Sequence, residues 1–181
     1  MQAVSFAART TFTGPTATGT GAAMATVSGG GATCGFDTSQ FVNAPSPLPA
    51  GVSFPHGLFN FTLTGCGAGG SATLTITYPS PLPTGTQYWK FGPTASDATA
   101  HWYTIAATIG GSSVTFTLID GGLGDDDLLA NGSIVDAGGP GLPGPSGAVA
   151  PIPTLSQWAM VLLAGLLALF GLGRVRRQTR S

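Results

Sequence analysis

The chain has 181 residues, and only 7% of them are charged, whereas an average globular protein has about 25%. It contains no Glu and a single Lys. The residues up to 173 carry two cations and seven Asp, a net charge of −5, and the four Arg of the last eight residues bring the total to −1. This composition excludes a nucleic-acid-binding surface, which needs Lys and Arg along one face, and a coiled coil, which needs Glu, Lys and Arg.

The first 32 residues are rich in Gly, Ala and Thr and end close to a run of three glycines at 29–31. Chains of this composition behave as flexible linkers, so we predict that residues 1–32 are a low-complexity linker or the remnant of an upstream region. The length of the chain leaves room for one domain after them.

Cys34 and Cys66 are the two cysteines of the chain. An even number of cysteines in a Thr/Gly-rich, Lys-poor chain indicates a disulfide formed outside the cytoplasm, with two buried free thiols as the alternative. A disulfide here would close a loop of about thirty residues and stabilise the domain by about 3–4 kcal/mol in the chain-entropy model.

Five segments between residues 59 and 119 have the composition of β-strands. In three of them large apolar residues alternate with Thr, Ser or Asn, which gives each strand a dry face and a hydroxyl-bearing face. The other two are rich in aromatic residues. The segments are 59–64, 73–78, 87–91, 101–109 and 113–119, with a hairpin turn at 109–112. Short strands without a helical period before residue 154 predict an all-β domain over residues 33–137, a β-sandwich of the immunoglobulin or jelly-roll kind.

Residues 138–151 are rich in Gly and Pro, and glycine recurs at every third position from 138 to 147. These triplets are too few for a triple helix. We therefore predict a stiff, solvated spacer that would reach about 40 Å if fully extended.

The C-terminal segment is strongly apolar: residues 158–172 contain no polar side chain, and residues 154–173 contain no charge. A helix of that length spans about 30 Å, the thickness of the hydrocarbon core of a bilayer. Trp158 lies near one end, as interfacial aromatic residues do. The alternative is a helix that packs against a partner, but an apolar helix after a Gly/Pro spacer has no core to join, which favours one C-terminal transmembrane helix. A basic stop follows the helix, formed by Arg174, Arg176, Arg177 and Arg180.

These arginines predict the orientation of the chain, because basic flanks of a transmembrane helix remain in the cytoplasm. The C-terminus is then cytoplasmic and the N-terminal domain extracytoplasmic, in agreement with the predicted disulfide. This orientation requires export, yet residues 1–9 hold only a short apolar patch, and their one cation, Arg9, follows it. We therefore expect the sequence to lack its signal peptide.

Residues 152–181 resemble the IPTL-CTERM sorting signal of bacterial envelope proteins, which is similar in plan to PEP-CTERM tails. The resemblance rests on the Pro-containing motif 152–158, the apolar helix at about 154–173 and the basic tail 174–181. It implies recognition by a membrane-embedded peptidase of the exosortase type, cleavage near the motif, and release or transfer to the cell surface. Ala159 stands where the family often has Gly. The matching motif residues are Ile152, Pro153, Thr154, Leu155 and Trp158.

Residues 34–140 also resemble the choice-of-anchor U domain, a module found just upstream of such tails. Modules of this kind are defined by their position beside an anchor, and the resemblance implies no catalytic activity. The matching stretches are spread over the whole domain and comprise 54–57, 63–66, 77–79, 85–90, 92–94, 101–103, 120–127, 131–132 and 138–140.

Four of the seven Asp lie within eight residues, and they are the candidate metal site. Carboxylates on a Gly-rich turn can bind Ca²⁺, which takes about six to eight oxygen ligands. The spacing does not match an EF-hand. The alternative is a solvated loop in which the Asp side chains cap turns. The four residues are Asp120, Asp125, Asp126 and Asp127, and no cofactor other than Ca²⁺ is expected.

Other patterns give weaker candidates for chemistry. Residues 65–70 have the glycine spacing of a dinucleotide-binding loop, but a predicted strand follows them where that fingerprint needs a helix. His56 and His101 are either general bases or structural imidazoles, and no nucleophile motif accompanies them. An aromatic group could form a carbohydrate-stacking platform, although alternation along a strand cannot place all four members on one face. They are Tyr88, Trp89, Trp102 and Tyr103.

The sequence therefore predicts a non-catalytic, exported protein of the bacterial cell envelope. We expect a single-pass membrane protein whose partners are membrane lipid and an exosortase-type peptidase, with no nucleic acid and with release to the surface after processing. The rival interpretation is a Ca²⁺- or glycan-binding adhesion module that is tethered by the same tail.

Overall fold

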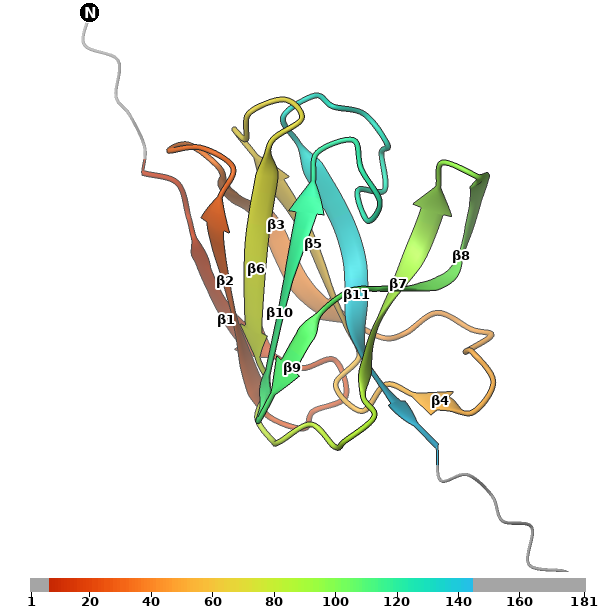
Figure 1. Cartoon of the computed structure of the whole chain (residues 1–181). Helices are drawn as coiled ribbons and strands as arrows, with labels where there is room; N and C mark the ends of the chain where they lie inside the picture. Colours follow the sequence, from red (N-terminus) through yellow and green to blue (C-terminus); the bar gives the residue numbers. More distant parts are fainter. Residues whose placement is uncertain (1–6, 145–181) are drawn as a thin grey trace, which may run out of the picture. The chain divides into compact units, whose positions relative to one another are not determined.

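The computed structural model describes residues 7–144 of the chain. The chain divides into two compact units, Met1–Pro145 and Ser146–Ser181, and all described residues belong to the first. These residues form eleven strands and no helix, and the strands assemble into two antiparallel sheets that face each other (Figure 1). The predicted all-β domain is therefore confirmed.

The first sheet has five strands, and its outer face is coated with hydroxyl groups. Its strands, in spatial order, are β1 (Thr11–Pro15), β2 (Ala22–Gly29), β6 (Ser71–Thr77), β10 (Ser113–Ile119) and β9 (Thr108–Gly110). Opposite residues of β6 and β10 join their hydroxyls, at 2.9 Å for Thr73–Thr117 and 3.0 Å for both Thr75–Thr115 and Thr77–Ser113. Cross-strand hydroxyl pairs of this kind stabilise a sheet, and these hydroxyl groups make the face polar without charged residues.

The second sheet has six strands, with β11 at its centre. Its strands, in spatial order, are β3 (Gly35–Val42), β5 (Leu58–Thr64), β11 (Ile134–Pro143), β7 (Gln87–Thr94) and β8 (Asp97–Ile105), and the short β4 (Val52–Ser53) pairs with the end of β11. β11 lies between β5 and β7 and is antiparallel to both.

The inward faces of the two sheets share one hydrophobic core, as expected of a sandwich. Phe59 and Phe61 of β5 are fully buried and contact Phe36 with ring centroids 5.9 Å apart in each case. Leu74 and Ile76 of β6 are equally buried on the opposite sheet. The alternation of apolar and hydroxyl residues along these strands therefore identified the buried face correctly.

The predicted strand 101–109 is interrupted in the structure. β8 ends at Ile105 and lies in the six-stranded sheet, whereas β9 begins at Thr108 and lies in the five-stranded sheet. The chain thus crosses between the layers at residues 106–107. The predicted turn joins β9 to β10, and Gly111 adopts a positive φ of 58° in it, which favours glycine.

The prediction that residues 1–32 are a linker is wrong for residues 11–29, which form β1 and β2. Ala23, Ala25 and Val27 alternate on the buried face of β2. β2 pairs along its length with β6, so these residues belong to the same core as the rest of the domain. Small residues fill this side of the core, and their composition is that of a linker, which is why the sequence pattern was misleading.

The prediction that residues 138–151 are a spacer is wrong for residues 138–143, which form the second half of β11. The backbone of this strand is closely packed: a Cβ atom on Gly139 would lie 2.5 Å from the carbonyl oxygen of Gly57, and one on Gly138 would lie 3.0 Å from that of Trp89. Only glycine fits at such contacts. Glycine is here because neighbours approach closely, and the domain extends beyond the predicted boundary at 137.

The predicted transmembrane helix at 154–173 and the rest of the predicted spacer lie outside the described residues. Within residues 7–144, no helix is long and apolar enough to cross a membrane.

Cys34 and Cys66 form the predicted disulfide, with a sulfur–sulfur distance of 2.03 Å. It joins the start of β3 to the loop after β5, and both cysteines are buried. Neighbouring backbone hydrogen bonds hold the same loops, from Gly67 N to Gly30 O at 2.8 Å and from Cys66 N to Gly132 O at 3.0 Å.

Candidate functional site

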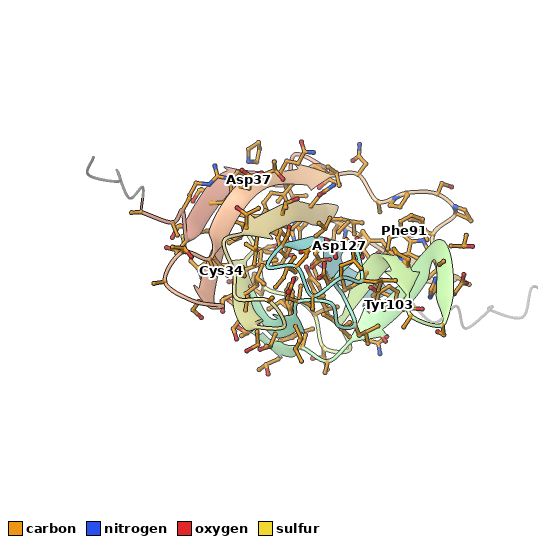
Figure 2. The ribbon with its side chains drawn as sticks, turned by 90° about the horizontal axis from the view of Figure 1, so that it is seen from above. Cys34, Asp37, Phe91, Tyr103 and Asp127 are labelled. Carbon is orange, nitrogen blue, oxygen red and sulfur yellow. A yellow bond between two sulfur atoms is a disulfide. The ribbon has the colours of Figure 1, made fainter. Side chains whose placement is uncertain are left out.

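The acidic loop, residues 120–133, joins β10 to β11 beside the loop that joins β5 to β6 (Figure 1). Seen from above in Figure 2, Asp127 of this loop lies between Cys34 on one side and Tyr103 on the other. The predicted metal ligands all belong to this loop, so their individual contacts decide what the loop does.

Asp120 connects three loop segments through one oxygen. The residue is buried, and its Oδ2 accepts hydrogen bonds from the backbone N–H groups of Gly69 at 2.8 Å and Gly132 at 2.9 Å. Such bonds satisfy backbone groups that no strand partner reaches. Asp120 thus fastens the β5–β6 loop to the end of the acidic loop.

Asp125 is fully buried and fastens the middle of the acidic loop to β11. Its Oδ2 accepts from Gly121 N at 2.8 Å, and its Oδ1 accepts from Val135 N at 2.9 Å. Burial raises the pKa of this carboxyl, against the opposing effect of the two hydrogen bonds. Both of its oxygens therefore have structural partners.

Asp127 caps the turn that follows it. Its Oδ1 accepts from Leu129 N at 2.8 Å, and its Oδ2 accepts from the Asn131 side-chain amide at 3.0 Å. Residues 7–144 contain no group of three or more His, Cys, Asp or Glu that could hold a metal ion. Asp127 thus caps a turn, as the alternative to a metal site expects, whereas Asp120 and Asp125 are buried and join separate segments.

Asp126 differs from the other three because it faces the buried Lys90. Its side chain lies over Gly92 of β7, where a Cβ atom would overlap with its Oδ1. Burial raises the pKa of Asp126 to about 7, against the opposing charge of Lys90. Its Oδ1 is buried without a hydrogen-bond partner.

Lys90 forms an ion pair with Asp136 inside the domain, a feature that the sequence analysis missed. Its Nζ lies 2.5 Å from Asp136 Oδ1, and both side chains have no exposed area. Nζ also donates a hydrogen bond to the carbonyl oxygen of Gly124 in the acidic loop. Burial raises the pKa of Asp136 to about 6, in opposition to the attraction of Lys90.

A period-two pattern could have indicated this pair. Lys90 occupies the same face of its strand as Tyr88, and Asp136 the same face of β11 as Ile134, so each follows a core residue by two positions. The aromatic residues on both faces of β7 concealed the pattern, and no strand was predicted in the region of β11.

The two histidines have separate, structural surroundings. The buried His56 makes a 2.7 Å hydrogen bond between Nδ1 and Thr20 Oγ1 and stacks on Tyr78 with centroids 5.0 Å apart, and burial lowers its pKa. His101 Nδ1 lies 2.8 Å from the carbonyl oxygen of Thr99. These contacts agree with the interpretation of both as structural imidazoles.

The four candidate aromatic residues do not form one platform. Tyr88 points into the core and stacks on Phe116 with centroids 4.3 Å apart. Trp102 stacks on Phe54 at 4.7 Å, and its Nε1 donates to Pro47 O at 2.9 Å.

A surface hollow lies elsewhere on the domain, and none of its lining residues has a titratable side chain. They are Ala106, Ala107, Thr108, Thr115, Phe116 and Thr117.

Comparison with known proteins identifies the C-terminal segment. The IPTL-CTERM motif matches residues 150–177, which include the five predicted motif residues and the first three arginines of the basic stop. Neither a curated protein nor a solved structure matches the chain. The matched segment lies outside the described residues. IPTL-CTERM is a C-terminal sorting signal, which indicates a protein of the cell envelope or surface.

Proposed function

We propose that the chain is a non-catalytic surface protein whose folded domain is displayed outside the bacterial cell and whose C-terminal segment anchors and sorts it. The IPTL-CTERM match at residues 150–177 carries this proposal. The segment 154–173 inserts into the membrane as one helix, the four arginines keep the C-terminus in the cytoplasm, and an exosortase-type peptidase cuts near the motif.

Two properties of the domain support display outside the cytoplasm. The Cys34–Cys66 disulfide is a bond that persists in oxidising compartments. The paired hydroxyl groups of β6 and β10 provide a polar surface without charged residues. Both suit a small domain that stands on a tether outside the cell.

The domain resembles choice-of-anchor U domains, so we further propose that it is a module that accompanies an anchor. Its expected topology is that of an immunoglobulin-like or jelly-roll-like sandwich.

The anchoring step is tested by a charge placed in the middle of the apolar segment. Leu167→Arg adds about 2.5–3.5 kcal/mol to the free energy of insertion at a helix centre. The eight large apolar side chains of the segment favour insertion by about 2.5–5 kcal/mol together, so the substitution nearly cancels insertion. We expect the variant to leave the membrane fraction of the producing bacterium.

Gln178→Arg is the matched control, because it adds the same charge within the basic tail. It should fractionate with the membrane as the unaltered chain does. Membrane association of Leu167→Arg equal to that of the control would contradict a membrane-spanning segment at 154–173.

The sorting step is tested separately with Pro153→Ala in the motif and Ser156→Ala as its neighbour control. The Pro153 variant should insert into the membrane but remain uncut, so it keeps the basic tail, whereas the Ser156 variant should be processed. Equal processing of the two variants would refute recognition through Pro153.

A further inference from the structure

The buried ion pair of Lys90 and Asp136 stands on two adjacent strands, in a position that suits a reaction between the two side chains. Lys90 of β7 is directly opposite Gly138 of β11, and Asp136 lies two residues before Gly138 on the same face. Gly124 of the acidic loop makes room for the end of the lysine side chain, because a Cβ atom there would lie 2.9 Å from Lys90 Nζ. The Nζ–Oδ1 distance of 2.5 Å brings amine and carboxyl into contact.

The surroundings of the pair do not favour the ionised form of Asp136. Both side chains have no exposed area, and neither oxygen of Asp136 accepts a well-oriented hydrogen bond. Nζ of Lys90 has the carbonyl oxygen of Gly124 as a further partner, but a buried carboxylate without further hydrogen bonds gains little from its charge, because water solvates it better. Transfer of one proton from Lys90 Nζ across this contact leaves an amine there and makes Asp136 a neutral carboxylic acid, the form of this carboxyl that a dry site favours.

Asp126 supplies a third group that can move protons in this site. The loop that bears it is held against β11 by a hydrogen bond from Asp126 N to Val135 O at 2.8 Å. Its side chain enters over Gly92, where any larger residue would overlap with it. The other titratable groups that face the pair are the buried or half-buried Tyr78, Tyr88, Tyr103 and Asp125.

We propose that Lys90 and Asp136 condense into an intramolecular amide bond that covalently joins β7 to β11. The neutral Nζ of Lys90 attacks Cγ of the protonated Asp136, and the N–C bond forms. The C–O bond to the acid hydroxyl then breaks, and this hydroxyl leaves as water after it takes up a proton from Asp126. Asp126 regains a proton from the amide nitrogen, so it is unchanged, and no oxidant or reductant is needed.

The position of the bond gives it a mechanical consequence. β11 is the last strand of the described residues 7–144, so a pull applied from the C-terminal side of the chain reaches β11 before the other strands of the domain. An amide to β7 anchors this strand to the chain 46 residues earlier in the sequence, outside the loop that the disulfide closes between residues 34 and 66. The condensation itself depends only on the folded domain and is independent of the proposed sorting.

The chain is well suited to a direct test because Lys90 is its only lysine. The full chain is purified in detergent from a host without a sorting peptidase, unfolded, reduced, alkylated and digested with trypsin, which needs a free lysine side chain. An amide predicts an intact mass lower than the sequence mass by one water, no cut after Lys90, and one fragment covering residues 10–174. An intact mass without the loss of water, together with separate fragments 10–90 and 91–174, would overturn the proposal.

Variants separate the bond from a mere ion pair. Asp136→Ala removes the acyl group. This variant should be cut by trypsin after Lys90, and its intact mass should equal the mass of its sequence without loss of water. Since this variant leaves a buried lysine unpaired and can fail to fold, Asp126→Asn provides the second test: the pair is retained, but the fraction of chains that have lost water should fall at least tenfold.

Asp127→Asn is the matched control, because it alters a neighbouring carboxylate that caps a turn and does not face Lys90. It should lose water as completely as the unaltered chain, and far-UV circular dichroism should show the same strand content for both variants. Complete bond formation in Asp126→Asn would overturn the role given to Asp126.

Discussion

The disulfide offers the sharpest test of how the domain is stabilised. Replacing both Cys34 and Cys66 with Ala removes a link across 32 positions of sequence. In the chain-entropy model, a closed loop of that length lowers the entropy of the unfolded chain enough to stabilise the folded state by about 3–4 kcal/mol at 25 °C. The hydrogen bonds from Gly67 to Gly30 and from Cys66 to Gly132 remain, so the double variant should keep its native structure.

Urea unfolding followed by tryptophan fluorescence measures this loss. The free energy of unfolding of the double variant should be about 3–4 kcal/mol lower than that of the oxidised chain, and the unaltered chain with its disulfide reduced should match the variant. A loss below about 1 kcal/mol would refute the reasoning, because the cross-link would then not restrict the unfolded chain as the model requires.

Three further predictions concern Asp126, the acidic loop and β11. The pKa of Asp126 is raised to about 7, so between about pH 4 and 7 the folded state binds more protons than the unfolded state. The free energy of unfolding should therefore fall as the pH rises through this range, by at most about 1.4 kcal/mol per pH unit. Urea midpoints across this range should show a smaller slope for Asp126→Asn, and an unchanged slope would contradict the assignment. Millimolar Ca²⁺ should leave the melting midpoint unchanged, because backbone N–H groups occupy Oδ2 of Asp120 and both carboxylate oxygens of Asp125. A Ca²⁺-dependent rise would restore the metal hypothesis. Gly139→Ala should lower the free energy of unfolding by about 1–3 kcal/mol through its clash with the Gly57 carbonyl, whereas Gly110→Ala, which meets no atom within 4 Å, should be nearly neutral.

The strands with alternating Thr and large apolar residues could be predicted from the sequence because one physical cause produced the pattern. Along β5, β6 and β10 one face meets the core and the other meets water, so burial and polarity alternate together. The disulfide could be predicted for a similar reason, since composition and compartment constrain a pair of cysteines.

β2 and β11 could not be predicted because their small residues serve packing. Ala25 is buried because the opposite sheet is close, and Gly139 is glycine because a carbonyl oxygen occupies the place of its side chain. The same residue types form flexible linkers elsewhere, and only the contacts with neighbouring strands distinguish the two cases.

The contacts of the acidic loop could not be predicted from the clustering of its Asp residues. The cluster at 120–127 suggested a Ca²⁺ site or a solvated loop, and in the structure three of its Asp residues accept hydrogen bonds from backbone or side-chain N–H groups. The role of Asp126 depends on the pair of Lys90 and Asp136. These two residues are far apart in the sequence, and the pairing of β7 with β11 brings them together.

The central claim, that the C-terminal segment sorts this domain to the cell surface, is tested most directly by the C-terminus of the mature protein. The protein is isolated from the surface of the producing bacterium, and its intact mass and C-terminal peptide are measured. The account predicts a chain that ends near the motif at 152–158 and lacks the basic tail 174–181. A chain that reaches the surface with Ser181 still in place would contradict it.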